Sequence, residues 1–108
     1  MIVAKFGGSS LADAKQFQKV RAIVTSDERR RVVVPSAPGK RFSDDDKITD
    51  MLYYCFYARQ RGDDFDAMFQ KISERYWEIA QELSLSLNLQ RSLEQIDAEV
   101  VAGPNADY

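Results

Sequence analysis

The most chemically suggestive segment of this sequence is the run from Lys5 to Ser10, which reads Lys-Phe-Gly-Gly-Ser-Ser. Glycine lets the backbone approach a phosphate closely, and the amide groups and dipole at the start of a helix favour an anion. Lys5 adds a full positive charge. The pattern therefore predicts an anion site, but it fits equally well a tight strand-to-helix turn with a solvated lysine. The residues alone leave both interpretations open.

The residue types exclude several kinds of chemistry. The chain has no histidine, which removes Ser-His-Asp and Cys-His nucleophile pairs, imidazole bases and His-ligated metals. A Walker A loop is also absent, since Lys5 precedes its glycines and Gly39-Lys40 is followed by Arg41. No GxGxxG follows the first expected strand. Chemistry must therefore use Lys, Arg, carboxylates, hydroxyls or backbone amides.

Composition places the chain among ordinary soluble globular proteins of at most one domain. It has 108 residues, of which 44% are hydrophobic and 30% charged. A net charge of −2 is too balanced for the basic face that grips nucleic acid, so we expect no nucleic-acid partner. No apolar run approaches the roughly 20 residues that cross a bilayer, and the N-terminus lacks a signal-peptide layout. We therefore expect no membrane partner and a cytoplasmic location.

The single cysteine, Cys55, cannot form an internal disulfide and has no second thiol for a redox or metal motif. This fits a reducing compartment. We interpret Cys55 as a small buried hydrophobic residue.

The first part of the sequence predicts a strand, a helix and a second strand. The apolar run 2–6 is closed by two glycines and favours a buried strand. Ser9 or Ser10 can cap a helix over 10–26, whose apolar residues recur at helical spacing. Three consecutive valines at 32–34 predict the second strand. Such a unit has parallel strands and a right-handed crossover.

Three further helices are expected after a polar loop over 40–46. Ser43 is expected to cap the first, and Gly62 to end it. The second spans 64–87, and the third is indicated by the spacing of Leu89, Leu93, Ile96 and Val100 and stops at Gly103-Pro104. Two parallel strands with helices leave open, apolar sheet edges. We therefore expect either the N-terminal part of a larger α/β protein or a chain that associates strongly.

Three other groups of residues suggest chemistry, and each has a simpler explanation. Asp44 to Asp46 with Asp50 could hold a cation, but acids at a helix start explain them better. Arg29 to Arg31 could bind an anion, but a solvated charge run is preferred. The aromatic residues between Tyr53 and Trp77 could line a cofactor pocket, and core packing or a surface awaiting other parts is preferred.

Two ordered motifs resemble those of a known family. Lys5 to Ser10 resembles the KFGGSS or KFGGTS signature of aspartate kinases, which belong to the amino acid kinase fold. Val32 to Arg41 resembles the VVxSAPGKR segment found in one branch of the same family. Thr49-Asp50 with Leu52 adds a third match. The resemblance is sharp over 1–52 and only helical in character from Tyr53 onward.

The resemblance implies a fold and an activity. The fold would be α/β, the N-terminal part of a three-layer α/β/α domain, with an incomplete two-strand parallel sheet and then a helix-rich segment. Residues 1–108 would form the amino-acid-substrate portion, without the nucleotide-binding half and the regulatory domains. The whole enzyme would transfer the γ-phosphoryl group of ATP to the β-carboxylate of L-aspartate. Mg²⁺ would be held mainly by phosphates and groups outside this chain, and the full protein would be a homo-oligomer.

The resemblance also implies residue roles around the transferred phosphate. Lys5 would be catalytic and hold the transferring phosphoryl group. Gly7 and Gly8 would contribute backbone amides, and Ser9 or Ser10 would lie close to the same oxygens. No residue of this chain is expected to ligate a metal.

Two hydroxyl residues would contact the aspartate substrate in the same scheme. These are Ser36, after the second strand, and Thr49, at the start of the next helix. Pro35 precedes Ser36 where many relatives carry a serine, which leaves the register of that hydroxyl open by one position.

Two alternatives remain at this stage. The chain could be a non-catalytic helical interaction module, or part of another amino acid kinase with a different acceptor. For the 108-residue chain by itself, we predict no detectable kinase activity and self-association through unpaired strand edges.

Overall fold

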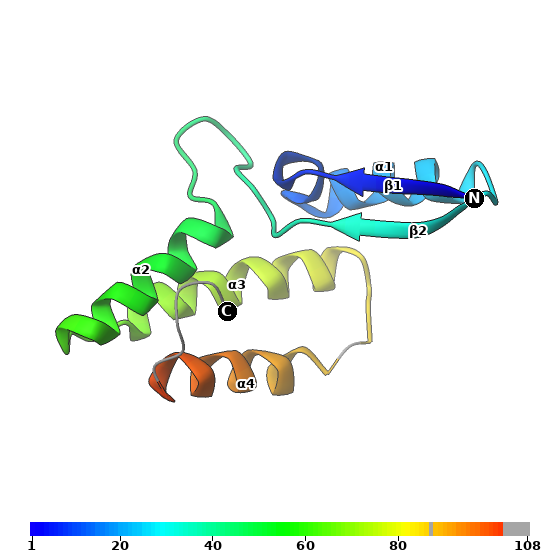
Figure 1. Cartoon of the computed structure of the whole chain (residues 1–108). Coiled ribbons are helices and arrows are strands. Elements are labelled where there is room, and N and C mark those ends of the chain that lie inside the picture. The colour runs from blue at the N-terminus through cyan, green and yellow to red at the C-terminus, as the bar shows by residue number, and fades with distance from the viewer. Residues whose placement is uncertain (87, 103–108) are drawn as a thin grey trace. The chain divides into compact units, whose positions relative to one another are not determined.

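The computed structural model describes residues 1–86 and 88–102 (Figure 1). Their contacts divide the chain into two compact units, 1–49 and 50–108. The expected α/β class is confirmed, because a two-strand parallel sheet is accompanied by helices. None of the helices within the described ranges is long and apolar enough to span a membrane.

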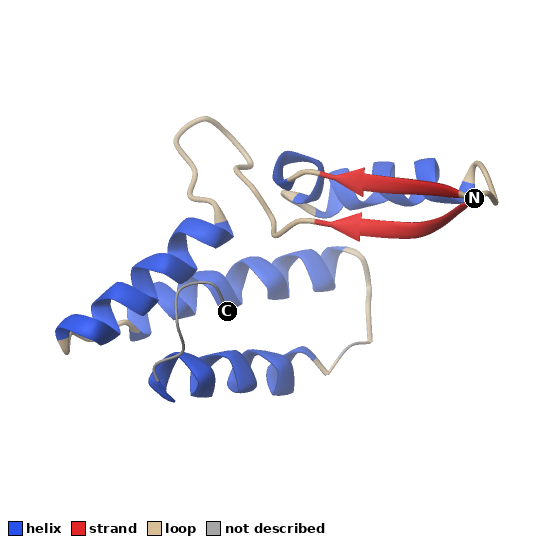
Figure 2. Ribbon diagram, viewed as in Figure 1, coloured by secondary structure: helices blue, strands red, loops and turns tan. Residues whose placement is uncertain are grey.

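The first unit is built on two parallel strands, β1 (Ile2–Phe6) and β2 (Arg30–Pro35). They are drawn as neighbouring arrows that point the same way (Figure 2). Lys5 pairs with Val34 and Phe6 with Pro35, so both strands end at one edge of the sheet. Alternate β1 side chains are partly buried, which is the pattern of a strand covered on one face. Both expected strands are confirmed, and β2 is longer than its three valines.

The helix between the strands starts later than the sequence suggests. Gly8–Leu11 forms a single 3₁₀ turn, η1, and the α-helix α1 covers Ala14–Thr25. The cap is Asp13, whose carboxylate accepts a 3.0 Å hydrogen bond from the Gln16 amide. The predicted caps Ser9 and Ser10 are therefore wrong. A carboxylate is at least as good a cap as a hydroxyl, and Leu11, in the turn before this cap, is buried with 3% of it exposed.

The loop after β2 also differs from its prediction. The helix α2 covers Ile48–Arg61, so the expected cap at Ser43 is wrong. Asp45 does not begin the helix because its carboxylate pairs with Arg41 at 2.7 Å. The predicted end is confirmed, since Gly62 follows α2 with a φ of +77°, which glycine adopts without strain.

The second unit consists of helices. In addition to α2 it contains α3 (Asp66–Glu82) and α4 (Leu89–Ala102), which run side by side (Figure 1). The expected helix over 64–87 is confirmed in its centre but stops earlier, before Ser84, which has a φ of 55°. Leu87 and the stop predicted at Gly103-Pro104 lie outside the described residues. The predicted helix is confirmed, because α4 contains Leu89, Leu93, Ile96 and Val100.

The core of the second unit is apolar apart from Arg75 of α3, which is 5% exposed. Its buried apolar side chains come from all three helices and the α2–α3 connection: Met51, Cys55, Ala58, Phe65, Phe69, Ile72, Ile79, Ala80, Leu93 and Val100. Cys55 is fully buried as expected, and burial raises the pKa of its thiol to about 11. A thiol with this pKa is neutral and unreactive at neutral pH.

The sheet of the first unit presents apolar side chains to solvent. Val3, Val32, Val33 and Val34 are each at least 40% exposed. The open, apolar strands expected from the sequence are therefore confirmed. The self-association predicted from them stays a prediction.

Candidate functional site

Lys5 lies near the carboxyl end of β1, one residue before the strand ends. Its side chain is exposed, and within residues 1–86 and 88–102 it makes no hydrogen bond or ion pair. Lys5 pairs with Val34 of β2, so it lies at the edge of the sheet where the two following loops begin. A lysine without a partner has its charge available to an anion.

The two loops that follow the strands are joined at a pair of glycines. The Gly39 amide donates a 2.8 Å hydrogen bond to the Gly8 carbonyl oxygen. A β-carbon on Gly39 would lie 2.6 Å from the Gly8 carbonyl carbon, and one on Gly8 would lie 3.1 Å from the Ala37 carbonyl oxygen. This approach requires a residue without a side chain at position 39, and a β-carbon at position 8 would be tightly packed. The sequence predicted the Gly7-Gly8 turn but missed the partner glycine.

The turn after β1 retains the donors that an anion site needs, but not a helix dipole. Ser10 donates from its amide to the Gly7 carbonyl oxygen at 3.1 Å. The donors of the two hydrogen bonds at this turn are the amides of Ser10 and Gly39, and the acceptors are the carbonyl oxygens of Gly7 and Gly8. The amides of Gly8 and Ser9 donate in neither bond. The prediction that a helix dipole acts at this turn is wrong, because only the four-residue turn η1 follows the glycines and α1 starts at Ala14.

The two predicted substrate hydroxyls lie at the two ends of the second loop. Ser36 directly follows β2 and is exposed. Thr49 is the second residue of α2 and is also exposed. The Ile48 amide donates to the Pro38 carbonyl oxygen at 3.1 Å, so the main chain beside Thr49 is tied back to the residue next to Gly39. The structure thus brings the main chain of all the predicted positions to one edge of the sheet.

An ion pair closes the loop between these positions. Two guanidinium nitrogens of Arg41, Nε and Nη2, donate to Asp45 at 2.7 and 3.0 Å, and the Arg41 amide donates to the same carboxylate at 2.9 Å. The Arg41 side-chain hydrogen bond holds the pKa of Asp45 well below its ordinary value of 3.8. A lowered pKa means that the pair is intact at neutral pH and is lost only in strong acid.

The remaining candidates from the sequence do not form a site with these residues. Arg29 pairs with Asp27 at 2.6 Å and is 70% exposed, as expected of a solvated charge run. In the described part of the chain, no three Asp, Glu, Cys or His side chains come together to hold a metal.

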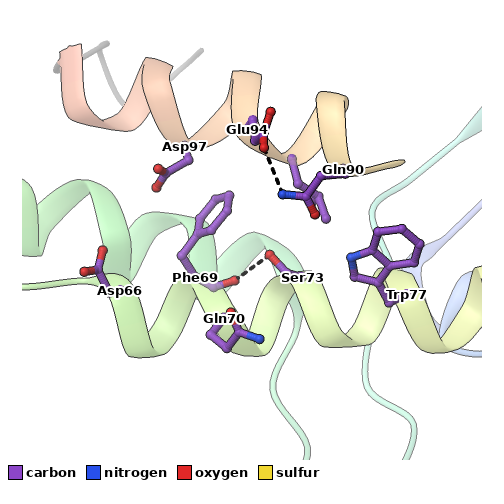
Figure 3. Close-up of a pocket in the computed structure, with 9 residues that line it drawn as sticks. Asp66, Phe69, Gln70, Ser73, Trp77, Gln90, Glu94 and Asp97 are labelled. Carbon is purple, nitrogen blue, oxygen red and sulfur yellow. Dashed lines mark hydrogen bonds between the residues drawn. The ribbon is translucent and has the colours of Figure 1, made fainter. Parts of the chain in front are cut away.

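A pocket of about 320 Å³ lies between α3 and α4 of the second unit (Figure 3). It is lined mainly by acidic, amide and aromatic side chains. The lining residues are Asp66, Phe69, Gln70, Ser73, Trp77, Gln90, Leu93, Glu94 and Asp97. Figure 3 shows Gln90 donating to Glu94, at 3.0 Å, and Ser73 donating to the Phe69 carbonyl oxygen, at 3.1 Å. None of the predicted phosphate or substrate residues lies here, and its acidic side chains would repel a phosphate.

Comparison with known proteins gives consistent matches. No family model matches the chain. It is 45% identical over 89 residues to aspartokinase 3 of Bacillus subtilis, a match that covers 82% of this chain and 20% of that protein. It is 30% identical over 100 residues to the chloroplastic bifunctional aspartokinase/homoserine dehydrogenase 1 of Zea mays, over 91% of this chain and 10% of that one.

A solved structure matches the whole chain. The aspartate kinase of Clostridium acetobutylicum superposes with a TM-score of 0.96 at 46% identity, over 100% of this chain and 25% of that one. The chain therefore spans between a tenth and a quarter of the length of these relatives.

Proposed function

Because this chain is a member of the aspartate kinase family over the residues that it spans, we propose that the protein transfers the γ-phosphoryl group of ATP to the β-carboxylate of L-aspartate. The product is 4-phospho-L-aspartate. The chain supplies the acceptor-binding and phosphate-holding part of the site as residues 1–108. In this proposal the nucleotide-binding half and the regulatory domains lie outside residues 1–108, and the relatives are four to ten times as long as the part that this chain matches.

The observation that carries the proposal is the hydrogen bond between Gly39 and Gly8, at the same end of the sheet as Lys5, which has no partner within residues 1–86 and 88–102. It joins the loops of two adjacent strands at the carboxyl edge of a parallel sheet, where α/β folds bind their ligands. An available ammonium group and closely approachable backbone there suit a phosphate.

The residues divide into two groups by role. Lys5 neutralises charge on the transferring phosphoryl group, and the backbone at Gly7 and Gly8, with the hydroxyl of Ser9 or Ser10, contacts its oxygens. Ser36 and Thr49 contact the aspartate.

The reaction suits a chain without histidine. An aspartate carboxylate, with an ordinary pKa of about 3.9, is ionised at neutral pH and needs no general base. Phosphoryl transfer then depends on alignment and charge neutralisation, which a lysine and backbone amides supply.

The co-substrate is ATP, and the family implies Mg²⁺ with it. The described residues offer no group of metal ligands, so we assign no side chain of this chain to the ion. The buried, unpaired thiol of Cys55 is consistent with a cytoplasmic location. The exposed valines of β2 are consistent with a larger, homo-oligomeric protein.

A chimera tests the activity directly. In the Clostridium acetobutylicum aspartate kinase, this chain would replace the matching segment, and ATP consumption would be measured with aspartate, glutamate and N-acetylglutamate. We expect turnover with aspartate and little with the other two acceptors. A folded chimera that is indifferent to aspartate, or that prefers another carboxylate, would contradict the proposal.

A further inference from the structure

We propose that the Arg41–Asp45 ion pair positions Thr49 for the acceptor substrate by holding closed the loop between Gly39 and Ile48. Arg41 and Asp45 are positioning residues in this scheme and touch no reacting atom. The inference rests on the proposed function, which assigns Thr49 to the aspartate substrate.

The loop is hydrogen-bonded at its base to the turn after β1, at Gly8. At its start, the Gly39 amide donates to the Gly8 carbonyl oxygen at 2.8 Å. At its end, the Ile48 amide donates to the Pro38 carbonyl oxygen at 3.1 Å, and the Ile48 side chain is fully buried. Thr49 follows directly. The Ile48–Pro38 hydrogen bond sets the position of Thr49 relative to Gly8, and this bond closes a loop. Whether it stays formed therefore depends on whether the intervening loop keeps one conformation.

The ion pair supplies that single conformation. Arg41 binds both carboxylate oxygens of Asp45 through its guanidinium group, and its amide binds one of them as well. The Asp45 amide donates back to the Phe42 carbonyl oxygen at 3.1 Å. Only 8% of the Asp45 side chain is exposed. A bidentate ion pair with a buried carboxylate restricts the relative orientation of its two residues, which a single solvent-exposed contact does not.

The chain offers a matched control in the pair Arg61–Asp63. Its 2.9 Å contact is similar in length, but its side chains are 56% and 61% exposed and it lies in the turn after α2. Solvent-exposed pairs of this kind contribute little to order. Asp63→Asn therefore removes one charge of an equivalent pair without touching the loop.

Amide hydrogen exchange of the 108-residue chain tests the closure itself. In Asp45→Asn we expect the amides of Arg41 and Ile48 to exchange about tenfold faster or more, as for a lost charge-assisted hydrogen bond. In Asp63→Asn both rates should be unchanged. Unaltered protection of Ile48 in Asp45→Asn would overturn the proposal.

Kinetics of the chimera test the link to the substrate. Asp45→Asn should raise the KM for aspartate about tenfold, the cost of one misplaced hydrogen bond, while kcat and the KM for ATP change little. Asp45→Glu, which keeps the charge, should restore part of the loss. An equal effect on both substrates would indicate a merely structural role and overturn the proposal.

The two proposals fail in different ways. A folded, unmodified chimera without aspartate-dependent turnover would contradict the proposed function, and the positioning role with it. An active chimera whose KM for aspartate is unaffected by Asp45→Asn would overturn the positioning role alone.

Discussion

The Gly39 amide donates to the Gly8 carbonyl oxygen at 2.8 Å, at a separation that leaves no room for a β-carbon on Gly39. This contact joins the loops that follow two neighbouring parallel strands. It places the main chain of the turn after β1, at Gly8, beside that of the loop leading to Thr49. The proposed active site depends on this approach of two backbones.

Replacing Gly39 by alanine should therefore destabilise the chain. The new β-carbon would lie 2.6 Å from the backbone of Gly8, and overpacking of this kind costs about 1–3 kcal/mol. Urea denaturation measures the free energy of unfolding. Gly7→Ala is the matched control, because nothing lies within 4 Å of a β-carbon there. Equal stability of the two variants would argue against the close contact.

Substitution of the two candidate caps, Asp13 and Ser10, tests which residue caps α1. Asp13→Ala removes the acceptor of the Gln16 amide and should lower the free energy of unfolding by about 1 kcal/mol. Ser10→Ala should have a smaller effect, since Ser10 caps no helix in the structure. The reverse order in thermal or urea denaturation would restore Ser10 as the cap.

Part of this fold can be predicted from the sequence. The strands and the end of α2 at Gly62 follow from local patterns, namely consecutive β-branched residues and a glycine able to take positive φ. The sequence does not locate the start of α1 because Ser10 and Asp13 are both good caps, and only the structure shows that Asp13 accepts the Gln16 amide.

The site was predicted in part for a similar reason. Lys5, Gly7 and Gly8 form a local motif, so the sequence identifies them. Gly39 and the Arg41–Asp45 pair matter only once the chain closes on itself, and Asp45 by itself resembles an acid at a helix start. An arginine four residues before an aspartate, just after Pro-Gly, was the signal available in the sequence.

The buried thiol predicts a dependence of stability on alkaline pH. The pKa of Cys55 rises to about 11 in the fold from an ordinary value of 9.0, so the unfolded chain releases its proton first. Stability should therefore fall as the pH rises between these two values. Cys55→Ala should show a flatter profile in urea denaturation over that range. Identical profiles would mean that the thiol is not desolvated.

The exposed strand pair predicts self-association of the 108-residue chain. Val33 is 40% exposed on β2, which pairs only with β1 among the described residues. Val33→Lys should reduce the associated fraction in sedimentation velocity, because charges on edge strands oppose strand pairing. Ile23→Lys on α1, where the native side chain is 47% exposed, is the control. A chain that is monomeric at all concentrations would contradict this expectation.

The role of Lys5 is tested most directly by Lys5→Ala in the chimera with the Clostridium acetobutylicum enzyme, with Lys15→Ala as the control on α1. Removal of a group that stabilises transition-state charge costs about 10²–10³ in kcat. We predict a loss of at least that size for Lys5→Ala, with an unchanged melting temperature and normal turnover in the control. Near-normal turnover without the Lys5 ammonium group would contradict the account.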